Sequence, residues 1–99
     1  MSTGATVTVY DEHDSFHLYI YCDGWPEMVI PEIESATKFS WEFPRFEAWD
    51  FATALIKVMK IRAWKIYLIN DVESISGRCY HYEVSKKDWD LKIKIDSFI

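Results

Sequence analysis

Residues 5–22, ATVTVYDEHDSFHLYIYC, contain two alternating apolar and polar runs around a five-residue polar loop. In the first run Ala5, Val7 and Val9 share one face, while threonines and a tyrosine share the other. The second run begins at Phe16 and keeps the same period of two. This period is typical of strands, and a short polar loop between two such runs predicts an antiparallel hairpin.

Residues 45–61, RFEAWDFATALIKVMKI, form the strongest helical pattern of the chain. The segment has no glycine or proline, and its acidic Glu47 and Asp50 precede its lysines, in agreement with the helix dipole. Its polar positions form a narrow stripe, so we expect this helix to lie across a sheet with most of its surface buried. A shorter helix is predicted for residues 26–38, interrupted or restarted at Pro31.

Three more alternating runs, residues 64–69, 78–84 and 89–95, predict three strands after the helices. We therefore expect an α+β fold with the order β-β-α-α-β-β-β. A single antiparallel sheet of about five strands would be covered by helices on one face. With 99 residues the chain forms a single domain, residues 1–99. The side chains expected in the core of the sheet are Leu18, Ile20, Trp89, Leu91, Ile93 and Ile95.

The charge of the chain is negative and unevenly distributed, with a net value of -5 at pH 7. Residues 1–55 contain ten acidic and two basic side chains, whereas residues 56–99 contain six acidic and nine basic ones. An acidic chain gains little attraction from phosphate backbones, so direct binding of nucleic acid is not expected. The acidic half is either an ordinary solvated surface or a surface complementary to a basic partner.

The sequence contains no familiar signal for catalysis, metal binding or membrane insertion. It has no phosphate-binding loop, dinucleotide fingerprint, nucleophile elbow or metalloprotease motif, so we expect no enzyme activity, cofactor or metal. Cys22 and Cys79 are far apart and form no CxxC motif, so we expect free thiols that point to opposite faces. No apolar run reaches the ~20 residues that span a membrane, and no signal peptide is recognisable, so the expected location is cytoplasmic.

One face of the predicted sheet carries tyrosine, histidine and acidic side chains. The candidates on this face are His17, Tyr19, Tyr21, Tyr67, Cys79, His81 and Glu83. Cross-strand pairing, a tyrosine-rich binding surface, or a small ligand-binding or catalytic site would each explain them. A nucleophilic pair of Cys79 and His81 is not expected, because residues two apart on a strand are separated by roughly 7 Å.

Four short stretches carry a family pattern: Met1-Ser2-Thr3-Gly4-Ala5, Asp23-Gly24-Trp25-Pro26, Pro44–Ala52, and Tyr80–Ser85 followed by Leu91–Ile93. In these stretches the chain resembles a group of small proteins from phages, prophages and other mobile elements. Those proteins begin with Met-Ser/Gly-Thr-Arg-Ala and end the second strand of a hairpin with Asp-Gly-Tyr-Pro. The later stretches resemble their central helix and closing hairpin. Here Gly4 replaces the arginine and Trp25 replaces the tyrosine.

The resemblance implies a small accessory protein of a mobile element, a class that includes inhibitors of bacterial defence systems. Several small acidic phage proteins, anti-CRISPR proteins among them, occupy the nucleic-acid-binding surface of a host protein. We therefore expect a non-enzymatic protein that binds a host protein, with formation of a homodimer left open. The alternative is a ligand-binding module or enzyme that uses the Tyr/His face, with His17, His81 and Glu83. The residues expected to contact the partner are Asp23, Trp25, Glu27, Trp41, Glu42 and Glu47.

Overall fold

The structure is a computed structural model that describes residues 3–99, and its elements follow the predicted order. In chain order they are β1 (Ala5–Tyr10), β2 (Ser15–Ile20), α1 (Pro26–Ala36), α2 (Ala48–Ile61), β3 (Ile66–Ile69), the 3-10 helix η1 (Val72–Ser74), β4 (Tyr80–Lys87) and β5 (Asp90–Ser97). Met1 and Ser2, the first residues of the phage-like motif, lie outside the described residues. Within residues 3–99, neither α-helix is long and apolar enough to cross a bilayer.

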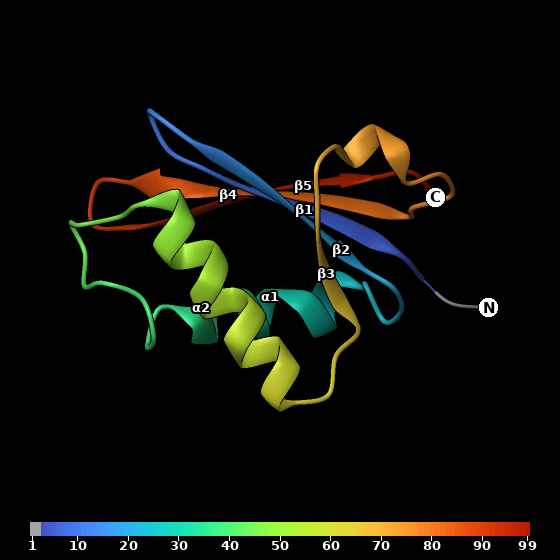
Figure 1. The fold of residues 1–99 in the computed structure, drawn as a ribbon, viewed down its shortest axis with the longest axis horizontal. Helices are drawn as coiled ribbons and strands as arrows, with labels where there is room; N and C mark the ends of the chain where they lie inside the picture. The colour runs from blue at the N-terminus through green and yellow to red at the C-terminus, as the bar shows by residue number, and fades with distance from the viewer. Residues whose placement is uncertain (1–2) are drawn as a thin grey trace.

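The five strands form one sheet in the order β3-β2-β1-β4-β5, and both α-helices lie on the same face of it (Figure 1). The fold is therefore α+β with a single sheet, as predicted. The expectation of a wholly antiparallel sheet is wrong at its centre, because β1 and β4 are parallel. The other three neighbouring pairs are antiparallel.

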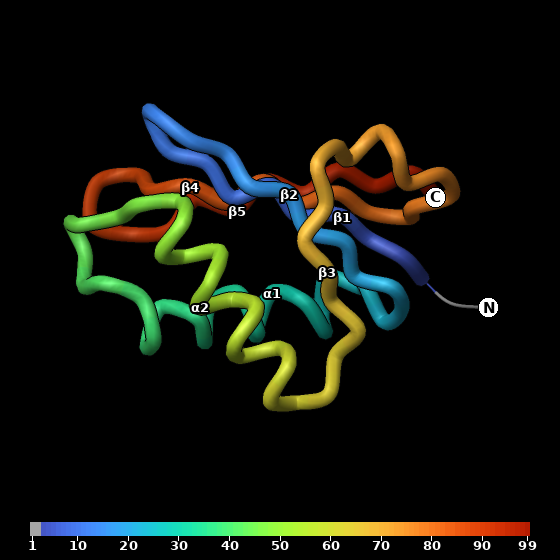
Figure 2. The backbone as a smooth tube through the Cα atoms, viewed as in Figure 1, coloured from blue at the N-terminus to red at the C-terminus, as the bar shows by residue number. Residues whose placement is uncertain are grey.

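The parallel pair results from the connection that follows β3. Strand β3 lies at one edge of the sheet, whereas β4 lies beyond β2 and β1. The chain therefore crosses the sheet through η1, which contacts β1 and β2 on the face opposite the α-helices (Figure 2). Because of this crossover, β4 runs in the same direction as β1, whereas a tight hairpin would reverse the direction of the chain.

The core fills the space between the sheet and the α-helices. Leu18 and Ile20 of β2 are fully buried, as predicted, and meet Phe51, Leu55 and Met59 of α2 within one apolar cluster. Spacings of four along α2 place these three side chains on one helical face, which explains why this face turns to the sheet.

Strand β5 is less buried than predicted. Leu91 and Ile93 are half-buried, and the lysines of the strand point to the opposite, exposed side, so the predicted register is confirmed. Ile95, however, is 41% exposed and Trp89 is 72% exposed, so neither belongs to the core. The reason is position: β5 is an edge strand, and Trp89 lies in the turn that precedes it.

The helix boundaries also differ from the prediction. Helix α1 continues through Pro31, which is exposed, so its ring faces solvent and only one backbone hydrogen bond of the helix is lost. Helix α2 begins at Ala48 instead of Arg45. The Ala48 N–H donates a hydrogen bond to Asp11 Oδ2 at 2.7 Å, so a carboxylate from the β1–β2 turn occupies the start of the helix.

Candidate functional site

The structure separates the six predicted partner-contact residues into two groups at opposite ends of α1. Asp23, Trp25 and Glu27 lie at its start. Trp41, Glu42 and Glu47 lie in the loop that follows it. Eleven helical residues span roughly 16 Å at 1.5 Å per residue, so the two groups do not form one continuous surface patch.

An ordered aromatic group lies where the loop after α1 meets the start of α2. We call it the Trp41–Trp49 cluster, and it consists of Trp41, Arg45, Glu47 and Trp49. The two indole rings meet edge to face, with centroids 5.0 Å apart. The Arg45 guanidinium carbon lies 3.4 Å from the centroid of the Trp41 ring, close enough for a cation–π contact. Glu47 accepts hydrogen bonds from Arg45 Nε at 3.0 Å and from Trp49 Nε1 at 3.1 Å.

Hydrogen bonds fix this cluster to the rest of the fold. The Trp41 N–H donates to Asp50 Oδ2 at 2.8 Å, which ties the loop to the first turn of α2. The start of α2 is in turn tied to the β1–β2 turn through Asp11. The Asp11 Oδ1 atom accepts from the N–H groups of His13 and Asp14, at 2.7 Å and 2.8 Å. The cluster is therefore held in one arrangement before any partner arrives.

The charge of Asp11 is part of this arrangement. Burial raises the pKa of Asp11, but hydrogen bonds from the N–H groups of Ala48, His13 and Asp14 lower it by more. The pKa consequently lies below its ordinary value of 3.8. The side chain is a carboxylate at neutral pH, and a negative charge at a helix N-terminus is favourable.

The exposed part of the cluster is aromatic. Trp49 is 47% exposed, Trp41 is half-buried and Arg45 is exposed, as is the neighbouring Glu42 outside the cluster. Tryptophan and arginine are the residue types most enriched at the energetic centres of protein interfaces. The indole N–H of Trp49 is already bonded to Glu47, so the ring surface is what the cluster offers to a partner. The sequence prediction missed Trp49, although its place two residues after the predicted Glu47 was a usable signal.

Trp25, at the other end of α1, has different surroundings. Its ring packs against Tyr80 of β4 with centroids 5.8 Å apart. Beside it, the C=O of Gly24 accepts a hydrogen bond from the Tyr82 hydroxyl at 2.6 Å, and the Gly24 N–H donates to the C=O of Thr3 at 2.8 Å. The turn that carries Trp25 is therefore fixed between the start of the chain and β4.

The predicted Tyr/His residues of β2, β3 and β4 lie on the face opposite the helices, but β1 separates the two histidines. The His81 Nδ1 atom lies 2.7 Å from Thr6 Oγ1, and the His17 Nδ1 atom lies 2.9 Å from Thr8 Oγ1. Both threonines belong to β1, so His17 and His81 interact with different residues of the strand between them. Glu83 approaches His81 only, with Oε2 3.6 Å from Nε2.

The His81 group is not the open surface that the sequence predicted. The segment with η1 crosses this face, His81 is 8% exposed, and Thr6 is fully buried. Burial lowers the pKa of His81, and Glu83 opposes this effect only in part. Thr6, His81 and Glu83 follow the order of a hydroxyl–imidazole–carboxylate relay, yet the buried Thr6 hydroxyl offers substrate no access. The hydrogen bond between Thr6 and His81 instead joins β1 to β4.

The exposed part of the Tyr/His face is a tyrosine cluster beside β3. Tyr19 stacks on Tyr67 and meets Tyr21 edge to face, both with centroids 6.4 Å apart. Lys60 Nζ lies 4.9 Å from the centroid of the Tyr67 ring. Burial raises the pKa of Tyr19, and the nearby Tyr21 raises it further. A small hollow of about 140 Å³ lies beside Tyr19 and Tyr21, lined on its other side by Arg78.

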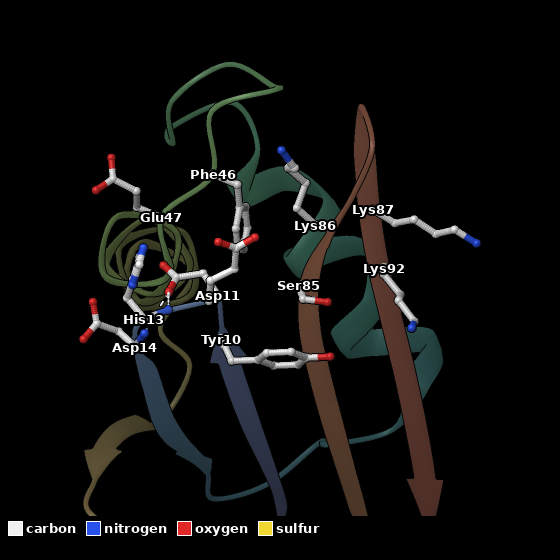
Figure 3. A pocket seen from close by; sticks show the side chains of 11 residues that line it. Tyr10, Asp11, His13, Asp14, Phe46, Glu47, Ser85, Lys86, Lys87 and Lys92 are labelled. Atoms are coloured by element: carbon white, nitrogen blue, oxygen red, sulfur yellow. Dashed lines mark hydrogen bonds between the residues drawn. The ribbon is translucent and has the colours of Figure 1, made fainter.

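A larger hollow of about 760 Å³ lies between the β1–β2 turn, the start of α2 and the β4–β5 hairpin (Figure 3). Its lining includes Asp11, Asp14 and Glu47 on one side and Lys86 and Lys87 on the other. Lys86 Nζ donates to the C=O of Pro44 at 2.8 Å, and Lys87 points away from the acidic side (Figure 3). No sequence pattern indicated this hollow, because three segments far apart in the chain form it.

The remaining candidate residues form no further site. Cys22 and Cys79 are half-buried free thiols, as predicted. In the part of the chain that the structure describes, no three His, Cys, Asp or Glu side chains are grouped so that they could hold a metal ion.

Comparison with known proteins identifies no relative of this chain. No family model matches the chain, and neither a curated protein nor a solved structure matches it. The function must therefore be inferred from the residues themselves.

Proposed function

We propose that this protein is a non-enzymatic binding protein whose Trp41–Trp49 cluster contacts a basic surface of a partner protein. One observation carries the proposal: Trp41 of the loop and Trp49 of the first turn of α2, which is 47% exposed, are held edge to face beside Arg45 and Glu47. Because the rings are already ordered, binding would lose little side-chain entropy. Aromatic anchors of this kind typically supply much of the affinity of an interface.

The charge around the cluster supports a basic partner. Glu42 and Glu47 belong to the loop, and Asp11, Glu12 and Asp14 form the neighbouring acidic side of the larger hollow. A mostly acidic rim steers a basic protein toward the aromatic centre and raises the association rate. The same rim repels nucleic acid, so nucleic acid itself is not the proposed ligand.

The resemblance to small phage proteins suggests a bacterial host protein as the partner. Proteins that bind nucleic acid carry basic surfaces, and an acidic surface with a tryptophan anchor can occupy such a surface. We therefore propose an inhibitor of a bacterial defence complex, of the anti-CRISPR type, that acts in the cytoplasm of the host. The first partners to test are the DNA- or RNA-binding subunits of such complexes.

The experiment compares two variants with an exposed aromatic ring removed. Immobilised protein captures partners from a bacterial lysate, and the captured protein is then purified and its binding is measured directly. Trp49→Ala should weaken this binding at least tenfold, whereas Phe98→Ala, near the C-terminus at the other end of the fold, should leave it unchanged. DNA or RNA that binds the partner should compete with the protein.

Two results would contradict the proposal. One is unchanged binding of Trp49→Ala to a partner that the native protein holds tightly. The other is loss of binding in His17→Ala or Tyr67→Ala while Trp49→Ala binds normally. That second result would transfer the function to the exposed part of the Tyr/His face.

A further inference from the structure

Three polar side chains form a row across β1, β4 and β5 on the face of the sheet opposite the α-helices. Ser85 of β4 pairs directly with Lys92 of β5. Val9 of β1 pairs with Val84 of β4. Because β1 and β4 are parallel, the residues that follow this pair, Tyr10 and Ser85, are neighbours as well. Val9 and Val84 are fully buried in the core, so alternation along the strands turns the row to the opposite face.

The row lines the side of the larger hollow that is formed by the β4–β5 hairpin. The hydroxyl groups of Tyr10 and Ser85 both extend toward β5, the strand that carries Lys92 (Figure 3). No hydrogen bond joins any of the three side chains to another residue that lines the hollow (Figure 3). Ser85 is only 7% exposed, and a polar group buried to this extent normally has a hydrogen-bond partner. The row therefore offers a ligand two hydroxyl groups and one ammonium group.

The charge at the row is positive. Lys87 is the diagonal neighbour of Lys92 on the same face, so both ammonium groups contribute to the potential there. Within residues 3–99, neither of these two lysines forms an ion pair. Asp14 and Glu47, on the acidic side of the hollow, point away from Lys92 (Figure 3). The row is therefore suited to an anion, although the chain as a whole is acidic.

We propose that Tyr10, Ser85 and Lys92 bind the phosphoryl group of a small phosphate monoester. A phosphoryl group of this kind has three acceptor oxygens and a charge of about -1.5 to -2 at pH 7, which suits three separate donors beside a second lysine. No arginine, the residue whose planar fork matches a carboxylate, lines the hollow among residues 3–99. At about 760 Å³ the hollow also has room for the organic part of the ester, next to the ring of Phe46.

The test is a titration of the purified protein with phenyl phosphate, followed by the shifts of backbone amide signals in NMR spectra. Moderate salt is used, so that distant charges are screened. We expect saturable shifts around the row, with a dissociation constant of about 1 mM or below. Inorganic phosphate should bind several-fold more weakly, because it lacks the organic part. Phenylacetate should bind about tenfold more weakly, because its carboxylate has only two acceptor oxygens and a single charge.

Four variants locate the site. Lys92→Gln should raise the dissociation constant for phenyl phosphate about tenfold, because it removes a charged donor. Lys94→Gln is the matched control: it lies on the same strand and face and changes the net charge equally, but it does not line the hollow. It should alter the dissociation constant by less than about twofold. Ser85→Ala and Tyr10→Phe each remove one hydroxyl group and should weaken binding several-fold. Thermal unfolding checks that all four variants are folded.

Absence of saturable shifts with phenyl phosphate would overturn the proposal. So would equal losses of affinity in Lys92→Gln and Lys94→Gln, which would indicate a general attraction by surface charge. Equal affinity for phenylacetate would refute the phosphoryl group as the ligand, and equal affinity for inorganic phosphate would refute the place of the organic part. The proposal does not depend on the Trp41–Trp49 cluster, so Trp49→Ala should bind phenyl phosphate like the native protein.

Discussion

Trp25 and Trp49 form an instructive pair. Each lies at the start of a helix in the acidic half of the chain, and their exposed fractions are similar, 38% and 47%. Trp25 packs against Tyr80 of a distant strand, beside a turn that is bonded to β4. Trp49 contacts Trp41 and Glu47, which belong to its own loop and helix. Contacts, more than exposure, therefore distinguish a ring that stabilises the fold from a ring that is available to a partner.

The most disruptive test of this contrast is Gly24→Ala, next to Trp25. A Cβ atom at Gly24 would lie 2.7 Å from Ala5 Cβ and 2.9 Å from the Thr3 carbonyl oxygen, so the backbone would have to move. We expect the free energy of unfolding to fall by about 3 kcal/mol in urea titrations. Gly4→Ala is the control, because its nearest contact would be an ordinary 3.6 Å. Equal stability of the two variants would show that the Trp25 turn is not rigid.

Trp25→Ala should lower the free energy of unfolding by about 2 kcal/mol, since the ring is only partly buried. Trp49→Ala should change it by less than about 1 kcal/mol, because the exposed ring covers little of the core. Thermal unfolding followed by circular dichroism measures both. If Trp49→Ala proved the more destabilising variant, the assigned roles of the two rings would be reversed.

Acid should weaken the two regions in different pH ranges. His81, adjacent to Tyr80, has a folded-state pKa below its ordinary 6.5, chiefly because of burial. The unfolded chain therefore takes up this proton first, and stability falls as the pH drops below 6.5. Asp11, which holds the start of α2 beside Trp49, has a folded-state pKa below 3.8, so its contribution is complete above that pH and is lost below it.

Urea titrations between pH 7 and pH 3 separate these contributions. His81→Gln should flatten the decline below pH 6.5, and Asp11→Asn should flatten only the decline below pH 3.8. The same pH profile in both variants and the native protein would refute the assignment.

The smallest expected effect concerns the rim of the Trp41–Trp49 cluster. Glu42→Lys should slow association with a basic partner by a few-fold and leave dissociation nearly unchanged, because exposed rim charges act mainly on the encounter. The difference should shrink in high salt, where charges are screened. Stopped-flow or biosensor kinetics at two salt concentrations measure it, with Glu73→Lys on η1 as the control. A change confined to the dissociation rate would place Glu42 in the centre of the interface.

The strands were predictable because their side chains alternate, and both helices were predictable from the proline at the start of α1 and the apolar stripe of α2. Strand pairing was not, because nothing in the local pattern of β4 shows that it pairs with β1. The exposure of Ile95 could not be predicted for the same reason, because the alternation of side chains is identical in an edge strand and a central strand.

The candidate site was predictable only in part. Trp41, Glu42 and Glu47 could be named because they are large or charged residues in a loop. That Trp49 forms a cluster with Trp41 and Glu47, and that Trp25 does not, depends on tertiary contacts. The burial of His81 was also hidden, since the covering η1 segment is a loop whose path over the sheet has no periodic signal.

The parallel pairing of β1 with β4 has a consequence for how the protein is made. Residues 5–9 pair with residues 80–84, so one side of the central strand β1 stays unpaired until β4 has been synthesised. At 5–20 residues per second, the chain from β1 to β4 takes roughly 4–15 s to emerge. Contacts of such long sequence separation also slow folding. During that interval the nascent chain exposes the β1 edge to other chains, and only the much later strand β4 covers it.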